Sequence, residues 1–258
     1  MNTSKLFDLQ GKTAILTGGA NGIGKASCRI LAAYGANVVV SDYNLEDAKK
    51  TAKEINDEGG KAIAIDCDVT KDDALVSLVE KTIDKFSGIH ILVNNVGGGG
   101  AGKESPFEMN VEQFKKVYEM NVFSMWRLCQ LVAPHMKIAG YGGIINMSSM
   151  ASINKSPAIS AYASSKAAIN HMTRNLAFDY GPAEIRINAI GPGAVKTHAL
   201  STVLTPEIER KMLEHTPIKR LGEPEDIAGA VLYFAAPISS WTSGQVIFVN
   251  GGGVQTLD

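Results

Sequence analysis

Short runs that are apolar on both faces alternate along the chain with longer segments whose apolar positions have helical spacing. The short runs predict buried strands at 13–17, 37–41, 62–67, 89–94, 143–147, 185–190 and 245–249. The segments between them predict helices at roughly 22–34, 45–58, 71–86, 107–139, 155–181 and 223–236. Strands that are apolar on both faces are typical of a parallel sheet covered by helices on each side. The sequence therefore predicts an α/β fold with a doubly wound parallel sheet of about seven strands.

The chain is predicted to form a single domain over residues 1–258, because it contains neither a Pro/Ser-rich linker nor a shift in composition. Residues 191–222 interrupt the alternation directly after a predicted strand. Open α/β sheets bind ligands at the carboxyl ends of their strands, so this segment is a candidate substrate lid. The simpler alternative is a surface helix packed on the core. Its apolar residues are Leu200, Val203, Leu204, Ile208, Met212 and Leu213.

Charge and composition argue against several classes of partner. Lys plus Arg number 25 and Asp plus Glu number 26, which gives a net charge of −1. A chain this close to neutral has no electrostatic attraction to nucleic acid or to an anionic membrane surface. The first residues lack the apolar core of a signal peptide, and no apolar run approaches the ~20 residues that span a bilayer. The three scattered cysteines and five histidines form no CxxC or HExxH motif, so we expect a cytoplasmic protein without a metal site.

A glycine-rich turn, TGGANGIG at residues 17–24, follows the first predicted strand. Gly18, Gly22 and Gly24 let the backbone approach a pyrophosphate, and the N-terminus of the next helix offers free N–H groups and a partial positive charge. Three glycines at this spacing are a weak signal by themselves. Their place in the first strand-to-helix turn predicts a dinucleotide site in preference to an ordinary tight turn.

The end of the second strand predicts which dinucleotide binds. Asp42 stands about twenty residues beyond the glycines, where a carboxylate accepts the adenosine ribose hydroxyls and repels a 2′-phosphate. Asn21 and Tyr43 are uncharged, so neither supplies a cation for that phosphate. The pattern favours NAD over NADP, and the alternative is a strand-end carboxylate in water.

Two more strand ends extend the predicted cofactor site. Asp68 and Val69 follow the third strand, where they would bond to and pack on adenine, although Asp68 could equally cap a helix. Asn95 and Gly97 follow the fourth strand. We expect the amide to anchor the sheet end and the glycine to admit the cofactor close to the sheet.

A Tyr-x-x-x-Lys motif opens the helical segment at 155–181. Tyr162 is the only one of seven tyrosines with a lysine, Lys166, four residues later. Residues four apart share a helical face, and an ammonium beside a phenol favours the phenolate and lowers a pKa that starts near ~10. Tyr162 is therefore a candidate general acid/base at an alcohol or carbonyl oxygen.

Two polar residues join this candidate catalytic set. Ser149, at the end of the fifth strand, can donate a hydrogen bond to the same substrate oxygen, although serines there are more often caps or turn formers. Asn121 is a poor helix former inside the predicted helix at 107–139. If buried it needs a partner such as a water or a backbone carbonyl, and the alternative is an exposed polar residue.

The whole chain resembles the short-chain dehydrogenase/reductase family. The resemblance implies a Rossmann-like sheet of seven strands, hydride transfer to or from a nicotinamide, and a homotetramer. It further implies that Ser149 polarises the substrate oxygen, that Tyr162 exchanges its proton, that Lys166 tunes Tyr162 and holds the nicotinamide ribose, and that Asn121 holds a water. The motifs that carry it are TGGANGIG, Asp42, Asp68-Val69, NNVG at 94–97, Asn121, Ser149, Tyr162/Lys166 and Pro192-Gly193.

Longer segments resemble one group within that family, the bacterial NAD-dependent 7α-hydroxysteroid dehydrogenases. This implies oxidation of the 7α-hydroxyl of bile acids, with Gly99 and Asn154 contacting the substrate. Cofactor contacts are implied for Ile23, Val195, Lys196 and Thr197. Two departures stand out: Val96 replaces the usual Ala, and the stretch 101–106, at the substrate mouth, is longer than in those relatives. The segments are LVNNVGGGG (92–100), SSM (148–150), YASSKAA (162–168), 205–228, SWTSGQ (240–245) and GGGVQ (251–255).

The apolar lid residues fit a steroid, because pockets for such ligands are mostly apolar, and Met150 and Ile153 could join them. A sugar, polyol or 3-oxoacyl substrate is the alternative, although a sugar site favours more Asn, Gln, Asp and Arg in the lid. A non-catalytic NAD-binding protein is a third interpretation, and the complete set of Ser149, Tyr162 and Lys166 argues against it. Apolar positions on several faces of the helices at 107–139 and 155–181 indicate self-association.

Overall fold

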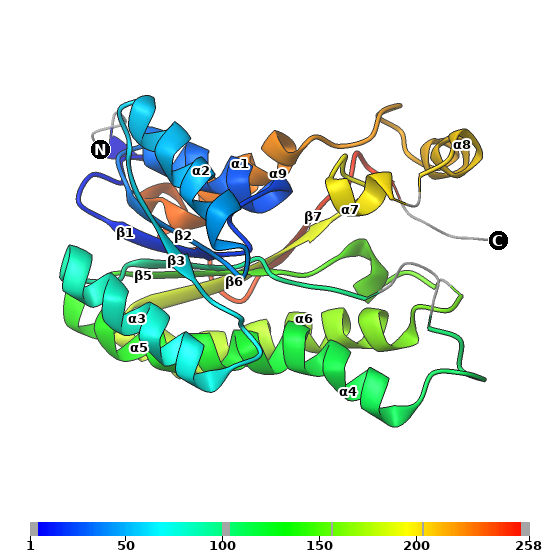
Figure 1. The fold of residues 1–258 in the computed structure, drawn as a ribbon, viewed down its shortest axis with the longest axis horizontal. Helices are drawn as coiled ribbons and strands as arrows, with labels where there is room; N and C mark the ends of the chain where they lie inside the picture. The colour runs from blue at the N-terminus through cyan, green and yellow to red at the C-terminus, as the bar shows by residue number, and fades with distance from the viewer. Residues whose placement is uncertain (1–4, 100–103, 156, 203, 254–258) are drawn as a thin grey trace.

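Seven parallel strands form the centre of the protein, and helices cover both faces of the sheet (Figure 1). The computed structural model describes residues 5–99, 104–155, 157–202 and 204–253. The strands are β1 (Thr13–Thr17), β2 (Asn37–Asp42), β3 (Lys61–Asp66), β4 (Ile91–Asn94), β5 (Gly142–Met147), β6 (Ile185–Pro192) and β7 (Val246–Val249). Their order across the sheet is β3-β2-β1-β4-β5-β6-β7, so the predicted doubly wound fold is confirmed.

Helices fill the connections between the strands. The α-helices are α1 (Gly22–Ala33), α2 (Leu45–Asp57), α3 (Asp72–Phe86), α4 (Val111–Tyr118), α5 (Ser124–Ala139), α6 (Ser160–Tyr180), α7 (His198–Ser201), α8 (Pro206–Glu214) and α9 (Pro224–Ala235). A π-helical turn, η2, spans Glu119–Phe123, and short 3₁₀ turns are η3 (Met150–Ser152), η4 (Gly181–Ala183) and η5 (Pro237–Ser239). Within the described residues, no helix combines the length and apolarity needed to cross a membrane.

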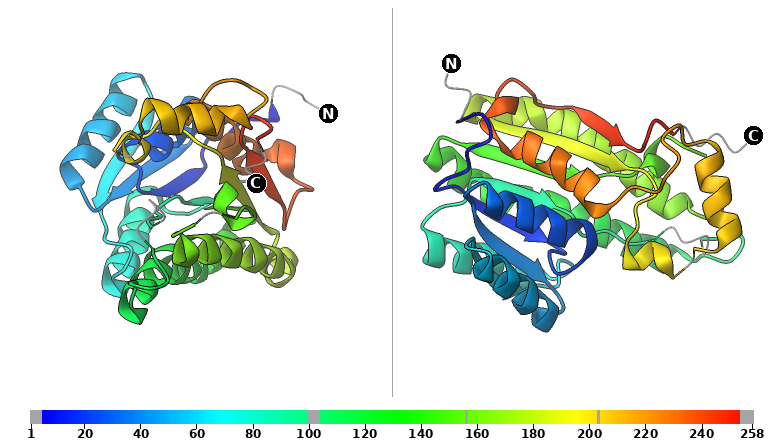
Figure 2. Two further views of the ribbon diagram at one scale, coloured as in Figure 1. Left: turned by 90° about the vertical axis from the view of Figure 1, so that its right-hand side faces the viewer. Right: turned by 90° about the horizontal axis from the view of Figure 1, so that it is seen from above.

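Strand β1 is an interior strand of the sheet, between β2 and β4, and is buried along its whole length. Ala14 and Leu16 belong to one apolar cluster, with residues of α1, α2 and α9. Ile15 belongs to a second cluster, with residues of α3, α5 and α6 on the opposite face. Figure 2 shows these two helical layers on either side of the sheet. The alternation of side chains along one strand therefore fills both layers of the core.

Two predicted helices differ from the structure. The segment 107–139 contains α4, η2 and α5 in succession, and it begins at Val111 because Asn110 and Gln113 form a capping box there. The helix predicted at 155–181 begins only at Ser160. Ala158 has a left-handed φ of 52°, which an α-helix does not allow.

The expected lid falls beyond the carboxyl edge of the sheet. β6 continues through Pro192, and α7 and α8 then lie past the end of the strands, away from the two helical layers (Figures 1 and 2). Strand β2 meets β1 with Val39 opposite Ile15, and β4 meets it with Leu92 opposite Ile15. Strand β2 lies on one side of β1 and β4 lies on the other. The chain segments that follow β1 and β4 therefore diverge, and a crevice is expected at the carboxyl ends of these two strands.

The complete burial of β1 predicts a large loss of stability when one of its core side chains is shortened. Ile15 is fully buried, so Ile15→Ala should lower the free energy of unfolding by about 2–5 kcal/mol. Ile138 on α5 is 86% exposed, and Ile138→Ala should change it by no more than about 0.5 kcal/mol. Urea unfolding followed by circular dichroism measures both variants, and equal losses would contradict this placement of the core.

Candidate active site

A cleft of about 440 Å³ opens at the carboxyl ends of β4, β5 and β6. Elements far apart in the sequence form its walls, including the start of α1, the first turns of α6 and the segment that follows β6. The predicted site residues that line it are Ile23, Asn95, Gly97, Gly99, Tyr162, Lys166, Pro192, Gly193, Val195 and Thr197. The structure thus brings predicted cofactor, catalytic and substrate residues to one cavity.

The turn after β1 is a cradle that excludes side chains. A Cβ at Gly24 would overlap the carbonyl oxygen of Gly18, and Gly18 and Gly22 have left-handed φ values of 63° and 53°. Asn21 precedes α1 and makes no side-chain hydrogen bond to its first turn. The free N–H groups of that turn and the bare backbone fit a pyrophosphate, which is the group that a dinucleotide presents there.

Asp42 closes this cradle at the end of β2. Its carboxylate accepts hydrogen bonds from the backbone N–H groups of Ala20, at 3.2 Å, and Asn44, at 3.0 Å. A carboxylate has about four acceptor positions, so two of them remain for ribose hydroxyls. The geometry therefore fits the expected role of Asp42 toward the adenosine ribose.

The surroundings of Asp42 are unfavourable for an added phosphate. Asn21 is uncharged, and the uncharged Tyr43 is 81% exposed. The cations of α1, Lys25 and Arg29, form ion pairs with carboxylates of α2 and its C-terminal cap. A 2′-phosphate would face the Asp42 carboxylate without a cation from these residues, so the site fits NAD.

The next two strand ends are ordered by local hydrogen bonds. The Asp68 carboxylate accepts from the backbone and the hydroxyl of Thr70, and these bonds lower the pKa of Asp68. Asp68 is exposed and shapes its own turn, so it does not cap α3, and Val69 behind it is buried. The Asn95 amide donates to the carbonyls of Thr17 and Gly18, both at 3.0 Å. Asn95 therefore ties the end of β4 to the glycine turn.

Tyr162 and Ser149 meet above Lys166. The Ser149 hydroxyl is within hydrogen-bonding reach of the Tyr162 phenol, and Tyr162 is in the first turn of α6. The Lys166 ammonium lies 5.6 Å from the centre of the Tyr162 ring and donates to the carbonyl of Met147 at 2.8 Å. Lys166 is only 3% exposed, and its burial lowers its pKa to about 8.

The predicted direction of the Tyr162 pKa is wrong. Burial raises the pKa of the Tyr162 phenol, and the hydrogen bond from Ser149 only partly offsets that effect. The Lys166 ammonium bonds to a carbonyl and lies over the aromatic ring, so it does not contact the phenolic oxygen directly. The unfavourable desolvation of a buried phenolate therefore affects the pKa of Tyr162 more than the positive charge of Lys166 does.

Asn121 lies in the π-helical turn η2 and is 1% exposed. Its Oδ1 accepts from the backbone N–H of Gly98, and its Nδ2 donates to the Gly98 carbonyl and to the Ser165 hydroxyl, each at 2.9 Å. The interpretation of Asn121 as an exposed helix residue is therefore wrong. Its side chain secures the segment after β4 next to Gly97, and its expected role with a water stays a prediction.

Of the residues that the closer resemblance implies as substrate or cofactor contacts, Lys196 and Asn154 do not line the cleft. The Lys196 side chain is exposed and forms an ion pair with Glu223. Asn154 follows the 3₁₀ turn η3, and its backbone N–H donates to the carbonyl of Met150. For Lys196 and Asn154, a match to the sequence motif was therefore not sufficient to predict that the residue lines the cleft.

The candidate lid contributes some of its apolar residues to the cleft. Leu200 and Met212 line the cleft. Leu213 lies instead in a groove on α8, beside Pro206, and Ile208 is partly exposed. Val203 and residues 100–103 of the expected substrate mouth lie outside the described residues.

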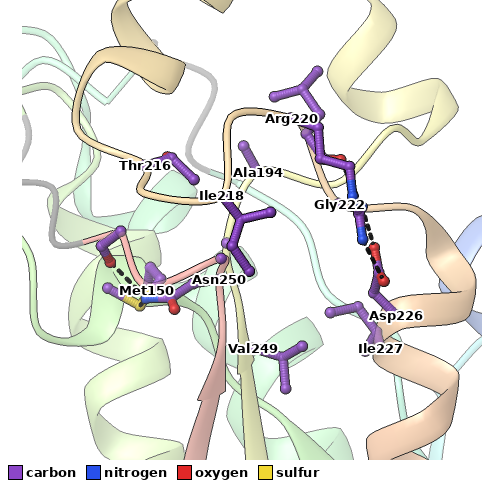
Figure 3. A pocket seen from close by; sticks show the side chains of 14 residues that line it. Met150, Ala194, Thr216, Ile218, Arg220, Gly222, Asp226, Ile227, Val249 and Asn250 are labelled. Atoms are coloured by element: carbon purple, nitrogen blue, oxygen red, sulfur yellow. Dashed lines mark hydrogen bonds and ion pairs between the residues drawn. The ribbon is translucent and has the colours of Figure 1, made fainter.

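A second cavity lies behind the segment that follows β6 (Figure 3). Met150 lines this cavity and not the cleft, and its sulfur accepts a hydrogen bond from the Asn250 amide. Arg220 and Asp226, on the opposite wall, pair with each other. Gly193 and Ala194 line both cavities, so this backbone forms a thin partition between them. Ile153 is 59% exposed, and the expected contact of Met150 and Ile153 with the substrate stays a prediction.

One functional candidate was missed by the sequence analysis. Glu104 is a buried carboxylate, and its Oε2 accepts a hydrogen bond from the backbone N–H of Tyr162 at 2.9 Å. The two residues are 58 positions apart, and no motif links them. Among the described ranges, no group of three His, Cys, Asp or Glu side chains is placed to hold a metal ion.

Comparison with known proteins gives full-length matches. A family model described as enoyl-(acyl carrier protein) reductase matches residues 18–253. The chain is 51% identical over 258 residues to the 7α-hydroxysteroid dehydrogenase of Escherichia coli K12, with all of both chains covered. It is 36% identical to the 7α-hydroxysteroid dehydrogenase of Clostridium sardiniense, over 95% of this chain and 94% of that protein.

The solved structures include a 7α-hydroxysteroid dehydrogenase complexed with NADH and 7-oxo glycochenodeoxycholic acid. It superposes with a TM-score of 0.95 at 50% identity, over the whole of both chains. A putative gluconate dehydrogenase from Agrobacterium tumefaciens superposes with a TM-score of 0.92 at 30% identity, covering 98% of this chain and 99% of that one.

The cradle after β1 predicts that a single methyl group weakens cofactor binding. The Cβ of Gly24→Ala would overlap the Gly18 carbonyl, so the turn must shift. The Kd for NADH should rise by about tenfold or more, which corresponds to roughly 1.4 kcal/mol. Gly229→Ala, on α9, is the matched control because nothing lies within 4 Å of the added Cβ. Fluorescence titration measures both, and an unchanged Kd in Gly24→Ala would contradict the proposed cradle.

Proposed function

The chain belongs to the short-chain dehydrogenase/reductase family, and we propose that it is an NAD-dependent dehydrogenase that reversibly oxidises the 7α-hydroxyl of bile acids to the 7-ketone. The observation that carries the proposal is the approach of the Ser149 hydroxyl to the Tyr162 phenol at an apolar-walled cleft. The full-length similarity to 7α-hydroxysteroid dehydrogenases supports the choice of substrate.

Tyr162 exchanges the proton of the substrate oxygen. In the oxidation direction its phenolate accepts the alcohol proton, and in the reverse direction its phenol returns a proton to the carbonyl oxygen. Ser149 donates a hydrogen bond to the same oxygen and stabilises the negative charge that develops there. Because burial raises the pKa of Tyr162, the phenol form predominates at neutral pH and oxidation should become faster as pH rises.

Lys166 acts from the base of the cleft. Its bond to the Met147 carbonyl uses one ammonium hydrogen, which leaves two for a ribose hydroxyl. Its positive charge also favours the phenolate over the phenol, although the structure gives burial the larger effect on Tyr162. Since its own pKa is about 8, this charge is lost as the pH rises through that value.

The protein groups that hold the cofactor follow the strand ends. We assign the pyrophosphate to the free N–H groups of α1 and the adenosine ribose to Asp42, with Thr197 reaching toward the glycine turn from the opposite wall. We also assign adenine to Asp68 and Val69, while Asn95 holds the end of β4 to the glycine turn. When bound, NAD would supply the acceptor for the hydride of the carbinol carbon.

The finer assignments of substrate contact and assembly are part of the proposal. Gly99 and the lid residues Leu200 and Met212 offer a steroid a largely apolar surface, and residues 191–222 act as the lid. We also propose a homotetramer, supported by large exposed apolar side chains such as Phe123 and Trp241. The free cysteines favour the cytoplasm as its compartment.

A panel of bile acids tests the proposed substrate. Purified protein with NAD should form NADH with cholate or chenodeoxycholate, which carry a 7α-hydroxyl, and form little with deoxycholate, which lacks it. NADH absorbance measures the initial rates. Equal rates with deoxycholate would contradict attack at position 7, and turnover only with a sugar, polyol or 3-oxoacyl substrate would refute the steroid assignment.

Removal of one hydroxyl tests the proton-exchanging residue. Tyr162→Phe should lower kcat about 10²- to 10⁴-fold while NADH still binds, because only the acid/base group is lost. Tyr34→Phe is the matched control, since Tyr34 lies at the far end of α1 and packs against Phe7. Steady-state kinetics and fluorescence titration separate the two effects. Near-normal turnover in Tyr162→Phe would remove this residue from the mechanism.

A further inference from the structure

The segment between β4 and α4 places a buried carboxylate beside the candidate active site. Glu104 is 6% exposed, whereas Phe107, three residues later, is 97% exposed. Burial of a carboxylate is unfavourable unless hydrogen bonds compensate for the lost water. The burial of Glu104 close to the exposed residues 106–108 therefore indicates specific contacts.

Those contacts are made to the beginning of α6, through both backbone and side chain. The Glu104 N–H donates to the Ala158 carbonyl at 2.9 Å, and Glu104 pairs with Ile159 in a parallel bridge. The carboxylate accepts from the N–H of Tyr162, the third residue of α6. The first N–H groups of a helix have no partner within it, and Ile159 at the N-cap supplies none. Glu104 therefore caps the helix that carries Tyr162.

The same carboxylate also lies next to Gly99, in the segment that follows β4. A Cβ added to Gly99 would lie 2.8 Å from Oε1 of Glu104 and 3.3 Å from the Tyr162 Cβ. Gly99 lines the cleft, and its φ of 104° lies in the region that favours glycine. Glu104 thus connects the segment after β4 to the start of α6, and Tyr162 lies at the junction.

Three polar groups determine the electrostatic environment of the Tyr162 phenol. Ser149 reaches it from the end of β5, the Lys166 ammonium lies over its ring from the next turn of α6, and Glu104 contributes a negative charge that raises its pKa. The charged residues of α4 and η2, which pack against α6, are exposed to solvent: Glu112, Lys115, Lys116 and Glu119. Of the strands packed on α6, β5 has no charged residue, and the only one in β6, Arg186, bonds to carbonyls at the opposite end of the sheet.

We propose that Glu104 is a positioning residue for the dehydrogenase reaction, which clamps the first turn of α6 against the Gly99 wall and fixes a negative charge beside Tyr162. This inference rests on the proposed function. A fixed negative charge disfavours the phenolate, so Glu104 keeps Tyr162 in its proton-donating form up to a higher pH. It thereby sets the pH range in which the alcohol is oxidised, without contacting the substrate itself.

Two substitutions separate the clamp from the charge. Glu104→Gln keeps an oxygen that accepts from the Tyr162 N–H but removes the charge, whereas Glu104→Ala removes both. Glu108→Gln is the matched control, since Glu108 is an exposed carboxylate four residues further along the chain. Titration of ζ-¹³C-labelled tyrosine by NMR, assigned with Tyr162→Phe, reports the Tyr162 pKa without any turnover.

We expect Glu104→Gln to lower the Tyr162 pKa by about 0.5–1 unit and to move the pH profile of kcat for oxidation by the same amount to lower pH. Its kcat at the new optimum should stay within about threefold of the unmodified enzyme. Glu104→Ala should show the same pKa change, and its kcat/KM should fall about tenfold at every pH because α6 loses its cap. Glu108→Gln should change neither quantity.

An unchanged tyrosine titration and pH profile in Glu104→Gln would overturn the role of the charge, whether or not Glu104→Ala folds. A kcat/KM equal to that of the unmodified enzyme in Glu104→Ala would overturn the clamp. If the unmodified protein fails to oxidise any 7α-hydroxy bile acid, the proposed function fails, and the NMR titration still decides whether Glu104 controls the phenol.

Discussion

The parallel arrangement of the seven strands is the constraint on which the site depends. In such a sheet every strand ends at the same edge, so residues that follow β1, β4, β5 and β6 meet there although long stretches of chain separate them. The burial of both sheet faces fixes the register and therefore the height of each strand end. The glycine cradle, Asn95, Ser149 and the Pro192 segment are neighbours for this reason.

Buried amides convert this common edge into a rigid platform. Asn94 on β4 donates to Asn146 on β5, which donates in turn to Thr173 on α6. Asn121 then fastens the segment after β4 from the π-helical turn. These buried hydrogen bonds join β4, β5 and α6, so they restrict displacement of the catalytic helix relative to the sheet. Burial at this edge raises the pKa of Tyr162 and lowers the pKa of Lys166, so it favours the uncharged form of both side chains.

Properties carried by local patterns could be predicted from the sequence, and properties that need depth or long-range contacts could not. The apolar runs placed all seven strands to within two residues, and the glycine spacing located the cradle. The direction of the Tyr162 pKa depends on how deeply the phenol is buried, which the spacing to Lys166 does not reveal. The placement of the Lys196 side chain depends on Glu223, which is 27 positions further along the chain. The contact between Glu104 and Tyr162 could not be predicted from the sequence, because 58 positions separate the two residues.

The thin partition formed by Gly193 and Ala194 gives the cleft two unlike walls. On the sheet side, side chains pack against a continuous core and have little freedom to yield. On the partition side, open volume borders the backbone on both faces, so fewer van der Waals neighbours resist its displacement. Displacement of this strip of main chain would therefore meet less resistance from packing than displacement of the sheet side of the cleft.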